Sequence, residues 1–199
     1  MPPFSEKALR LILDAEGLDQ PGKWPGAQSG VTIGIGYDLG YVTRDQFESD
    51  WGPFLPTSTR ERLSTVIGLR GLKAKNAASK LASIKIRRVD AEEVFKTRSI
   101  PLQCFRTALA FPGVDVLPLD AQGALVSLVF NRGTSMVDKP GEDRRKEMRA
   151  IREAVPRQDL RAIAAQLRSM KRLWEGMRLQ GLIDRREAEA VLVESCIPT

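Results

Sequence analysis

Three polar side chains near the amino terminus have types and a spacing suited to acid–base chemistry. Glu16 is followed by Gly17 and a glycine-rich stretch, in which Thr32 and a second carboxylate, Asp38, lie close together. Hydrolysis of a glycosidic bond needs a carboxylic acid that protonates the leaving oxygen. It also needs a second group, on the opposite face of the sugar, that activates water or attacks directly. These residues therefore form a candidate site for glycoside hydrolysis.

The composition excludes several other chemistries. The 199 residues include no histidine, which rules out a Ser-His-Asp triad, a Cys-His nucleophile and a histidine-bearing zinc site. Cys104 and Cys196 lie far apart and form neither a metal-binding quartet nor a disulfide framework. We expect both cysteines to be buried as small apolar side chains, with a single disulfide between them as the alternative.

The flanking sequence predicts how the three candidates are positioned. Ser5 is a favourable N-cap, and apolar side chains then recur at helical spacing until Gly17, which favours a helix end. Glu16 is therefore expected in the last turn of an amino-terminal helix. Over residues 17–40, glycine, proline and serine alternate with short β-branched runs, which predicts a loop and a small β-hairpin or sheet that carries the other two candidates.

The rest of the chain is predicted to be mostly helical. An apolar stretch, residues 121–130, is expected to form a central buried helix that ends at Asn131-Arg132-Gly133. A polar surface loop should follow over 137–147. The other expected helices are 44–51 after the cap Thr43, those beginning at Pro56 and at Asp90, one from Pro156 to about Trp174, and the last over 181–192.

Three segments of the chain resemble one known family. Glu16-Gly17 and the later run Ser-Gly-Val-Thr-Ile-Gly-Ile-Gly-Tyr-Asp of 29–38 are similar to the catalytic segment of phage-type lysozymes, especially of the variant found in pesticin-like bacteriolytic toxins. Residues 122–133 resemble the core helix of that family, and 181–189 resemble its closing helix. The resemblance covers most of the chain, least clearly over 55–110.

The resemblance implies a role for each candidate. Glu16 matches the general acid, and Thr32 matches the threonine that helps to hold the nucleophilic water. Phage-type members commonly carry an aspartate in the loop before this threonine, whereas the loop 20–28 contains no acid here. We expect Asp38, which the pesticin-like variant also places shortly after its threonine, to be the second carboxylate, with Asp19 as the alternative.

Further residues are expected to support the site. The family's closing helix brings an arginine to the catalytic glutamate, and Arg185 is the matching position, so it is expected to hold the Glu16 side chain. Tyr37, Asn131 and Arg132 are expected to bind substrate or support the site. Trp24 is expected either to stack on a sugar ring or to fill the core of the small lobe.

Structural alternatives stand beside these roles. Thr32 is a good β-former that could simply pack in a strand, and Asp38 could stabilise the following turn by accepting bonds from backbone amides. Asn131 and Arg132 could cap the carbonyls of the helix that they end. The glycines of 34–40 superficially resemble a dinucleotide-binding loop, but their spacing differs from that fingerprint, so no nucleotide site is expected.

The predicted fold is α+β and lysozyme-like. A single domain, residues 1–199, would comprise an amino-terminal helix (1–16), a small β-containing lobe (17–55) and a larger helical lobe (56–199), with the catalytic cleft between the lobes. The resemblance implies an inverting muramidase that cleaves the β-1,4 bond between N-acetylmuramic acid and N-acetylglucosamine in bacterial peptidoglycan, without a metal or cofactor.

Two other function classes are compatible with the sequence. One is a catalytically weak or inactive lysozyme-like protein that binds glycan, and the other is a basic nucleic-acid-binding protein, which the net charge of +6 permits but no motif supports. We expect a monomer with no nucleic-acid partner and no stable membrane insertion. Because the amino terminus lacks a signal-peptide pattern, we expect synthesis in the cytoplasm and action in the bacterial periplasm, after holin-type release of an endolysin or secretion of a toxin.

Overall fold

The computed structural model describes residues 4–198, which fall into two compact units. The hairpin unit is Glu16–Ile100, and the helical unit combines the chain up to Ala15 with the segment from Pro101 onward. The described residues are mostly helical with one two-stranded antiparallel sheet, so the predicted α+β class is confirmed. Within residues 4–198, no helix is long and apolar enough to cross a membrane.

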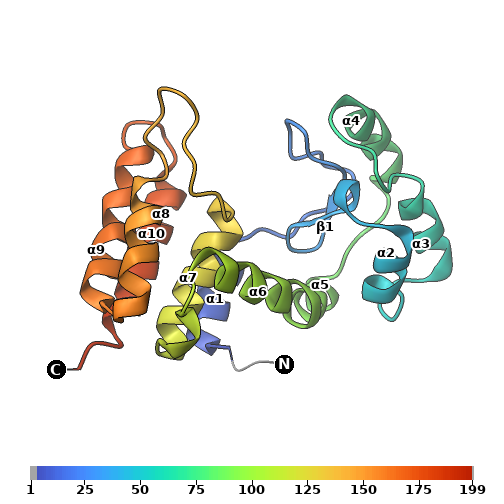
Figure 1. The fold of residues 1–199 in the computed structure, drawn as a ribbon. Helices are drawn as coiled ribbons and strands as arrows, with labels where there is room; N and C mark the ends of the chain where they lie inside the picture. The colour runs from blue at the N-terminus through green and yellow to red at the C-terminus, as the bar shows by residue number, and fades with distance from the viewer. Residues whose placement is uncertain (1–3, 199) are drawn as a thin grey trace. The chain divides into compact units, whose positions relative to one another are not determined.

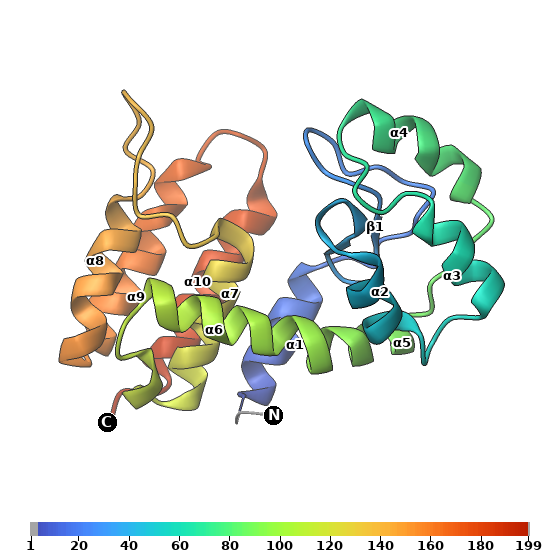
Figure 2. The same cartoon turned by 45° about the vertical axis from the view of Figure 1, so that its right-hand side comes forward.

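A short sheet organises the start of the hairpin unit. Strand β1 (Thr32–Ile33) pairs antiparallel with β2 (Tyr37–Asp38), so the hairpin is formed as predicted. Gly34 and Gly36 in the connecting turn have φ values of +63° and +65°, a region that favours glycine. The glycines that resembled a nucleotide loop therefore serve to reverse the chain. Figure 2 shows this hairpin beside α2 (Arg44–Trp51).

Helices form the remainder of the hairpin unit. Thr43 caps α2 as predicted, because its Oγ1 accepts a hydrogen bond from Gln46 N–H at 3.1 Å. The unit runs on to Ile100, past the lobe boundary expected near residue 55. One reason is Gln20, whose side chain pairs with both backbone groups of Ile86, at 2.8 and 3.0 Å, and so ties the two ends of the unit together. The helices after α2 are α3 (Thr57–Ser64), α4 (Leu72–Ala78) and α5 (Arg88–Val94).

The helical unit packs around α7 (Leu119–Arg132), which confirms the predicted central buried helix. Gly123 lets α1 (Glu6–Ala15) approach closely, because a Cβ at this position would lie 2.2 Å from the Cβ of Ala8. Both views show α1 beside α7, and α8, α9 and α10 side by side (Figures 1 and 2). The other helices of this unit are α6 (Ile100–Ala110), α8 (Lys146–Ala154), α9 (Leu160–Ser169) and α10 (Gln180–Glu194).

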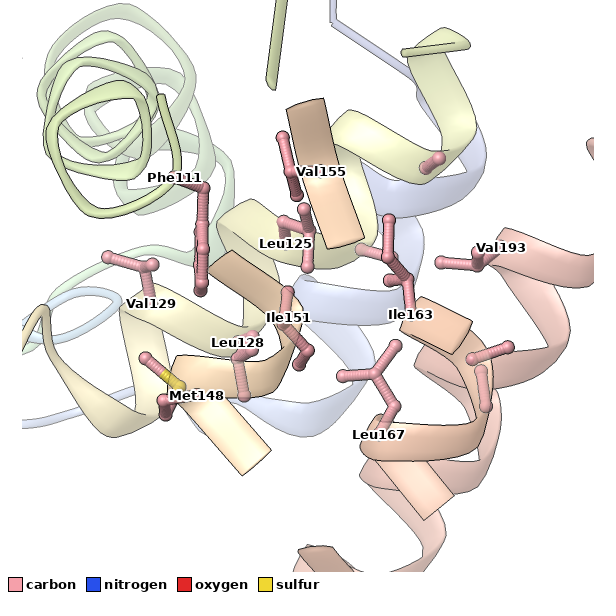
Figure 3. Packing of buried hydrophobic residues seen from close by; sticks show 14 of the residues in the cluster. Phe111, Leu125, Leu128, Val129, Met148, Ile151, Val155, Ile163, Leu167 and Val193 are labelled. Atoms are coloured by element: carbon pink, nitrogen blue, oxygen red, sulfur yellow. The ribbon is translucent and has the colours of Figure 1, made fainter. Parts of the chain in front are cut away.

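Apolar side chains from α7 to α10 converge on one core (Figure 3). Leu125 and Leu128 of α7 meet Ile151 of α8, and Ile163 and Leu167 of α9 close the cluster; all five are fully buried. Each such side chain contributes about 1.5–3 kcal/mol relative to leaving it in water. This core fixes the helices that carry the charged residues described below.

The first helix ends one residue earlier than expected. Ser5 caps it as predicted, with its Oγ accepting a hydrogen bond from Ala8 N–H at 3.1 Å. The helix stops at Ala15, so Glu16 follows the helix and does not lie in its last turn. Glu16 is thereby the first residue of the hairpin unit, and Gly17 follows it directly.

Two proline residues explain other departures from the predicted helices. The helix expected to open at Asp90 begins at Arg88 and continues through a π-helical turn, Phe95–Ser99, into α6. Pro101 has no N–H and crowds the carbonyl one turn earlier, which disfavours regular α-helix there. Pro156 lies in a separate 3-10 turn, so the helix expected from this proline begins at Leu160, after the cap Asp159.

Candidate active site

The hairpin brings Thr32 and Asp38 together. These residues are direct partners in the register of β1 and β2. Opposite residues of an antiparallel pair share one face, with their Cβ atoms about 4.5–5.5 Å apart. Thr32 is only 6% exposed, yet its hydroxyl makes no hydrogen bond to any residue within 4–198. The Thr32 hydroxyl is therefore available to a water molecule or a ligand beside the Asp38 carboxylate.

Backbone amides hold the Asp38 carboxylate. Its Oδ1 accepts hydrogen bonds from Gly40 N–H (2.8 Å) and Gly30 N–H (3.0 Å), and Oδ2 also lies 3.0 Å from the Gly30 nitrogen. Asp38 thereby caps the 3-10 turn Leu39–Tyr41. The turn-stabilising interaction considered from the sequence is thus present, and it fixes the direction of the carboxylate.

Glu16 and Asp19 lie in the segment that enters the hairpin unit, and both are half-buried. Asp19 forms a β-bridge with Gly34, and its Oδ2 accepts a hydrogen bond from Gly36 N–H at 3.2 Å. Burial raises the pKa of Asp19, the Gly36 bond opposes that shift, and the negative charges of Glu16 and Asp38 raise it further. Asp19 therefore senses the negative charges of both Glu16 and Asp38 within the hairpin unit.

Tyr37 points into the interior of the hairpin unit. Its hydroxyl donates a 2.8 Å hydrogen bond to Oδ2 of Asp50, and its ring meets that of Trp51 edge to face, with the centroids 5.8 Å apart. Burial and the Asp50 carboxylate raise the pKa of the Tyr37 hydroxyl. Tyr37 thus supports the hairpin from behind, beside the Thr32–Asp38 pair.

Trp24 is half-buried and closes the loop before β1. Its Nε1–H donates a hydrogen bond to the carbonyl of Ser29 at 3.0 Å, and Lys75 lies 5.8 Å from the ring centroid. The ring is therefore fixed in place by its loop, with part of its surface left open to a ligand.

In the helical unit, Asn131 is exposed and Arg132 is half-buried at the end of α7. Arg132 donates to the carbonyl of Arg144 at 2.6 Å, and its guanidinium carbon lies 5.2 Å from the centroid of Trp174. Burial lowers the pKa of Arg132 to about 10, and repulsion from Arg145, Arg144 and Arg186 adds to this shift. Arg132 thus ties α7 to the loop before α8.

Arg185 belongs to a buried charge network between α7 and α10. Its Nε donates to Oγ of Ser127 (3.1 Å) and lies 3.5 Å from Oε1 of Glu189. The same Glu189 oxygen accepts bonds from Ser127 (2.6 Å) and Arg186 (2.6 Å). Burial raises the pKa of Glu189, and both arginines oppose that shift. The expected role of Arg185 toward Glu16 stays a prediction.

The sequence alone did not single out four residues that support these side chains: Asp50, Ser127, Arg186 and Glu189. Three local signals for them are present in the sequence. Gln46 and Asp50 have i,i+4 spacing on α2 and are hydrogen-bonded at 2.7 Å. Glu189 follows the two arginines at i+4 and i+3 on α10, and Ser127 interrupts an apolar helix.

Both cysteines are free, as the leading expectation has it, but each is half-buried where full burial is expected. Burial raises the pKa of the Cys104 thiol. Among residues 4–198, no three acidic or cysteine side chains lie close enough together to hold a metal ion.

Comparison with models of known protein families identifies a match. A family model described as phage lysozyme matches residues 66–189, more than half of the chain. The matched span contains Asn131, Arg132 and Arg185, whereas Glu16 and the hairpin precede it. Comparison with curated proteins found no match.

Proposed function

The chain belongs to the phage lysozyme family, and from this premise we propose that it is a muramidase that cleaves the β-1,4 bond between N-acetylmuramic acid and N-acetylglucosamine. Lysozymes of this family degrade the peptidoglycan of the bacterial cell wall. The observation that carries the finer proposal is the register of the hairpin, in which Thr32 lies opposite the oriented Asp38 carboxylate and its hydroxyl makes no hydrogen bond to residues 4–198.

The proposed reaction uses three side chains. Protonated Glu16 donates its proton to the glycosidic oxygen as the bond to the anomeric carbon breaks. A water molecule, held by the Thr32 hydroxyl, attacks that carbon from the opposite face, and Asp38 accepts its proton. The product sugar gains the hydroxyl with inverted configuration, and the leaving sugar gains the Glu16 proton. The reaction uses no metal and no cofactor.

The other site residues take supporting roles in this proposal. Asn131 offers an exposed amide, and the open part of the Trp24 ring offers a stacking surface, both of which suit a glycan. Tyr37 holds the hairpin through Asp50, and Arg132 and Arg185 are held by their own units as described above. We further propose a monomer of the pesticin-like variant, which reaches the wall after holin-type release or secretion and has no nucleic-acid partner.

One observation favours a second candidate function. The Asp38 carboxylate already accepts bonds from two backbone amides, which is also what a purely structural aspartate does. If Asp38 only shapes the turn, the protein binds glycan without efficient turnover.

The decisive experiment compares wild type with Glu16→Gln on outer-membrane-permeabilised Gram-negative cells, by loss of turbidity and by analysis of soluble fragments for reducing-end muramic acid. Loss of the general acid should lower turnover at least about 100-fold. Glu61→Gln is the matched control, because Glu61 is exposed in the same unit and makes no ion pair with the described residues. Equal clearing by wild type and Glu16→Gln would refute the assignment of Glu16.

Asp38→Asn separates the two candidate functions. Asparagine keeps an acceptor oxygen for the Gly30 and Gly40 amides but is a poor base, so the variant should fold and lose turnover by about 100-fold. Wild-type turnover of folded Asp38→Asn would show that Asp38 is not the second carboxylate. If wild type itself released no fragments yet sedimented with purified wall, the binding function would replace the muramidase.

A further inference from the structure

Asp19 connects the segment that carries Glu16 to the turn of the hairpin. Its backbone exchanges two hydrogen bonds with Gly34, from Asp19 N–H to the Gly34 carbonyl (2.7 Å) and from Gly34 N–H to the Asp19 carbonyl (3.0 Å). Its side chain adds a third bond, in which Oδ2 accepts from Gly36 N–H at 3.2 Å. One residue thus binds both glycines of the turn.

These bonds bear directly on the position of Glu16. Only Gly17 and Leu18 separate it from Asp19, so its Cα lies within about 11 Å of the Asp19 Cα even with the chain fully extended. Gly17 is exposed, and a Cβ built on it would meet nothing within 4 Å, so packing does not restrain this residue. Among the described residues, Asp19 is the first after Glu16 that hydrogen-bonds to the hairpin.

The link from Gly36, which Asp19 binds, to Asp38 and Thr32 is also short. Gly36 directly precedes β2, in which Asp38 faces Thr32 of β1. A shift of the turn relative to Asp19 would move Thr32 and Asp38 relative to Glu16. Reacting groups must be held within a fraction of an ångström, since misplacement by 1 Å can cost about 100-fold in rate.

We propose that Asp19 is a positioning residue for the reaction, whose carboxylate holds the Glu16 segment against the turn that carries Thr32 and Asp38. This inference rests on the proposed function of those three residues. In this role Asp19 does not activate the attacking water and does not contact the sugar. This distinguishes the proposal from the alternative in which Asp19 is the second catalytic carboxylate.

The charges around Asp19 disfavour its ionised form. Burial raises the pKa of Asp19, the Gly36 N–H favours its ionised form, and the charges of Glu16 and Asp38 raise the pKa further. Local stability does not explain a half-buried carboxylate that feels two other negative charges. The bond from Gly36 explains why an acceptor is required there.

The test compares Asp19→Asn with Asp19→Ala, beside Glu16→Gln and the control Glu61→Gln, with kcat and KM measured on soluble peptidoglycan fragments. Asparagine keeps an acceptor for Gly36, whereas alanine removes it. We expect Asp19→Ala to lower kcat about 10-fold with KM changed less than about twofold, and Asp19→Asn to restore kcat to within about twofold of wild type.

Each outcome distinguishes a positioning role of Asp19 from no role in the reaction and from a catalytic role. Wild-type kcat in Asp19→Ala, with Glu16→Gln inactive, would overturn the positioning role and leave the proposed function intact. Loss in Asp19→Asn as severe as in Glu16→Gln would overturn it in favour of a catalytic carboxylate. Activity in Glu16→Gln would instead refute the proposed function itself.

A measurement independent of activity covers the case in which Asp19→Ala does not fold. In wild type, the amide proton shift of Gly36 should follow the titration of Asp19, with a midpoint above the ordinary value of 3.8. In Asp19→Asn that titration should disappear. A Gly36 amide shift that does not change with pH in wild type would overturn the proposal.

Discussion

Two regions of the molecule hold partly or fully buried carboxylates in fixed positions, and they do so by different means. In the hairpin unit, Asp38 and Asp19 are held by the N–H groups of glycines in tight turns. In the helical unit, Glu189 is held by Arg186 and Ser127 among apolar helices. Backbone amides are neutral donors fixed by the turn, whereas Arg186 and Glu189 each need the other's charge.

The difference teaches where each region is vulnerable. A half-buried carboxylate on backbone donors can lose its charge and leave behind only neutral groups that water can also satisfy. A fully buried ion pair that loses one partner leaves an uncompensated charge in a low-dielectric interior. We therefore expect substitutions in the α7–α10 network to affect stability first, and substitutions in the hairpin to affect geometry first.

Removal of Glu189 should break the helical unit most severely. Glu189→Ala leaves Arg186, whose side chain is 0% exposed, without its carboxylate partner at 2.6 Å. Loss of one partner of a buried pair costs about 3–5 kcal/mol of unfolding free energy. Urea denaturation followed by circular dichroism measures this change.

Glu153→Ala provides the matched control for Glu189, because Glu153 is an exposed glutamate on α8. It should change the unfolding free energy by less than about 0.5 kcal/mol. If Glu189→Ala behaved like Glu153→Ala, the buried network would contribute nothing measurable, and the contrast between the two regions would fail.

The sequence predicted the helix caps and the hairpin, because these features depend on residues that are close together along the chain. Ser5 and Thr43 were recognised as helix caps, and the glycines on both sides of Ile35 indicated the hairpin that pairs Thr32 with Asp38. Such signals act over a few residues, through capping bonds and allowed φ values. The amide contacts of Asp38 were foreseen for the same reason, as an alternative to catalysis.

The sequence did not predict the contacts that arise from packing. Ser127 and Glu189 are 62 residues apart, so their hydrogen bond exists only once α7 and α10 meet. The inward direction of Tyr37 likewise depends on Asp50 and Trp51, which α2 brings to the hairpin. The helix boundaries near Pro101 and Pro156 also differ from the predicted ones, because proline disfavours regular helix without specifying which structure replaces it.

A milder effect is expected where the hairpin is packed tightly. A Cβ at Gly30 would lie 2.2 Å from Oδ1 of Asp38 and 2.4 Å from the nitrogen of Gly40. Gly30→Ala should therefore displace the Asp38 carboxylate and cost about 1–3 kcal/mol of unfolding free energy. We also expect turnover to fall by more than this loss of stability alone would cause at a temperature where the variant stays folded.

Gly17→Ala is the control for Gly30, since a Cβ there would meet nothing within 4 Å. Thermal melting of both variants, with turnover on permeabilised cells, measures the contrast. Equal melting temperatures for the two variants would show that the backbone around Gly30 adjusts to accommodate a Cβ. Asp38 would then be held less firmly than its amide bonds indicate.

The smallest effect should come from removing a charge without removing its hydrogen bond. The folded state raises the pKa of Asp19 above 3.8, so the folded protein holds this proton more tightly than the unfolded chain does. The contribution of Asp19 to the stability of wild type should therefore fall as pH rises from about 3.8 through the folded-state pKa of Asp19, and it is then constant at higher pH. Asp19→Asn lacks that loss and should be slightly more stable than wild type at pH 7.

Urea denaturation of wild type, Asp19→Asn and Glu61→Gln between pH 3 and pH 7 tests this sign. The advantage of Asp19→Asn should shrink as pH falls, because Asp19 becomes protonated in both the folded and the unfolded state. Glu61, which is exposed, should show no such trend. A variant that is less stable at neutral pH would mean that the ionised bond to Gly36 outweighs burial and the charges of Glu16 and Asp38. The bonds to the hairpin carboxylates would then contribute to stability, as those of the α7–α10 network do. The two regions would differ only in their donors, which are backbone amides in one and side chains in the other.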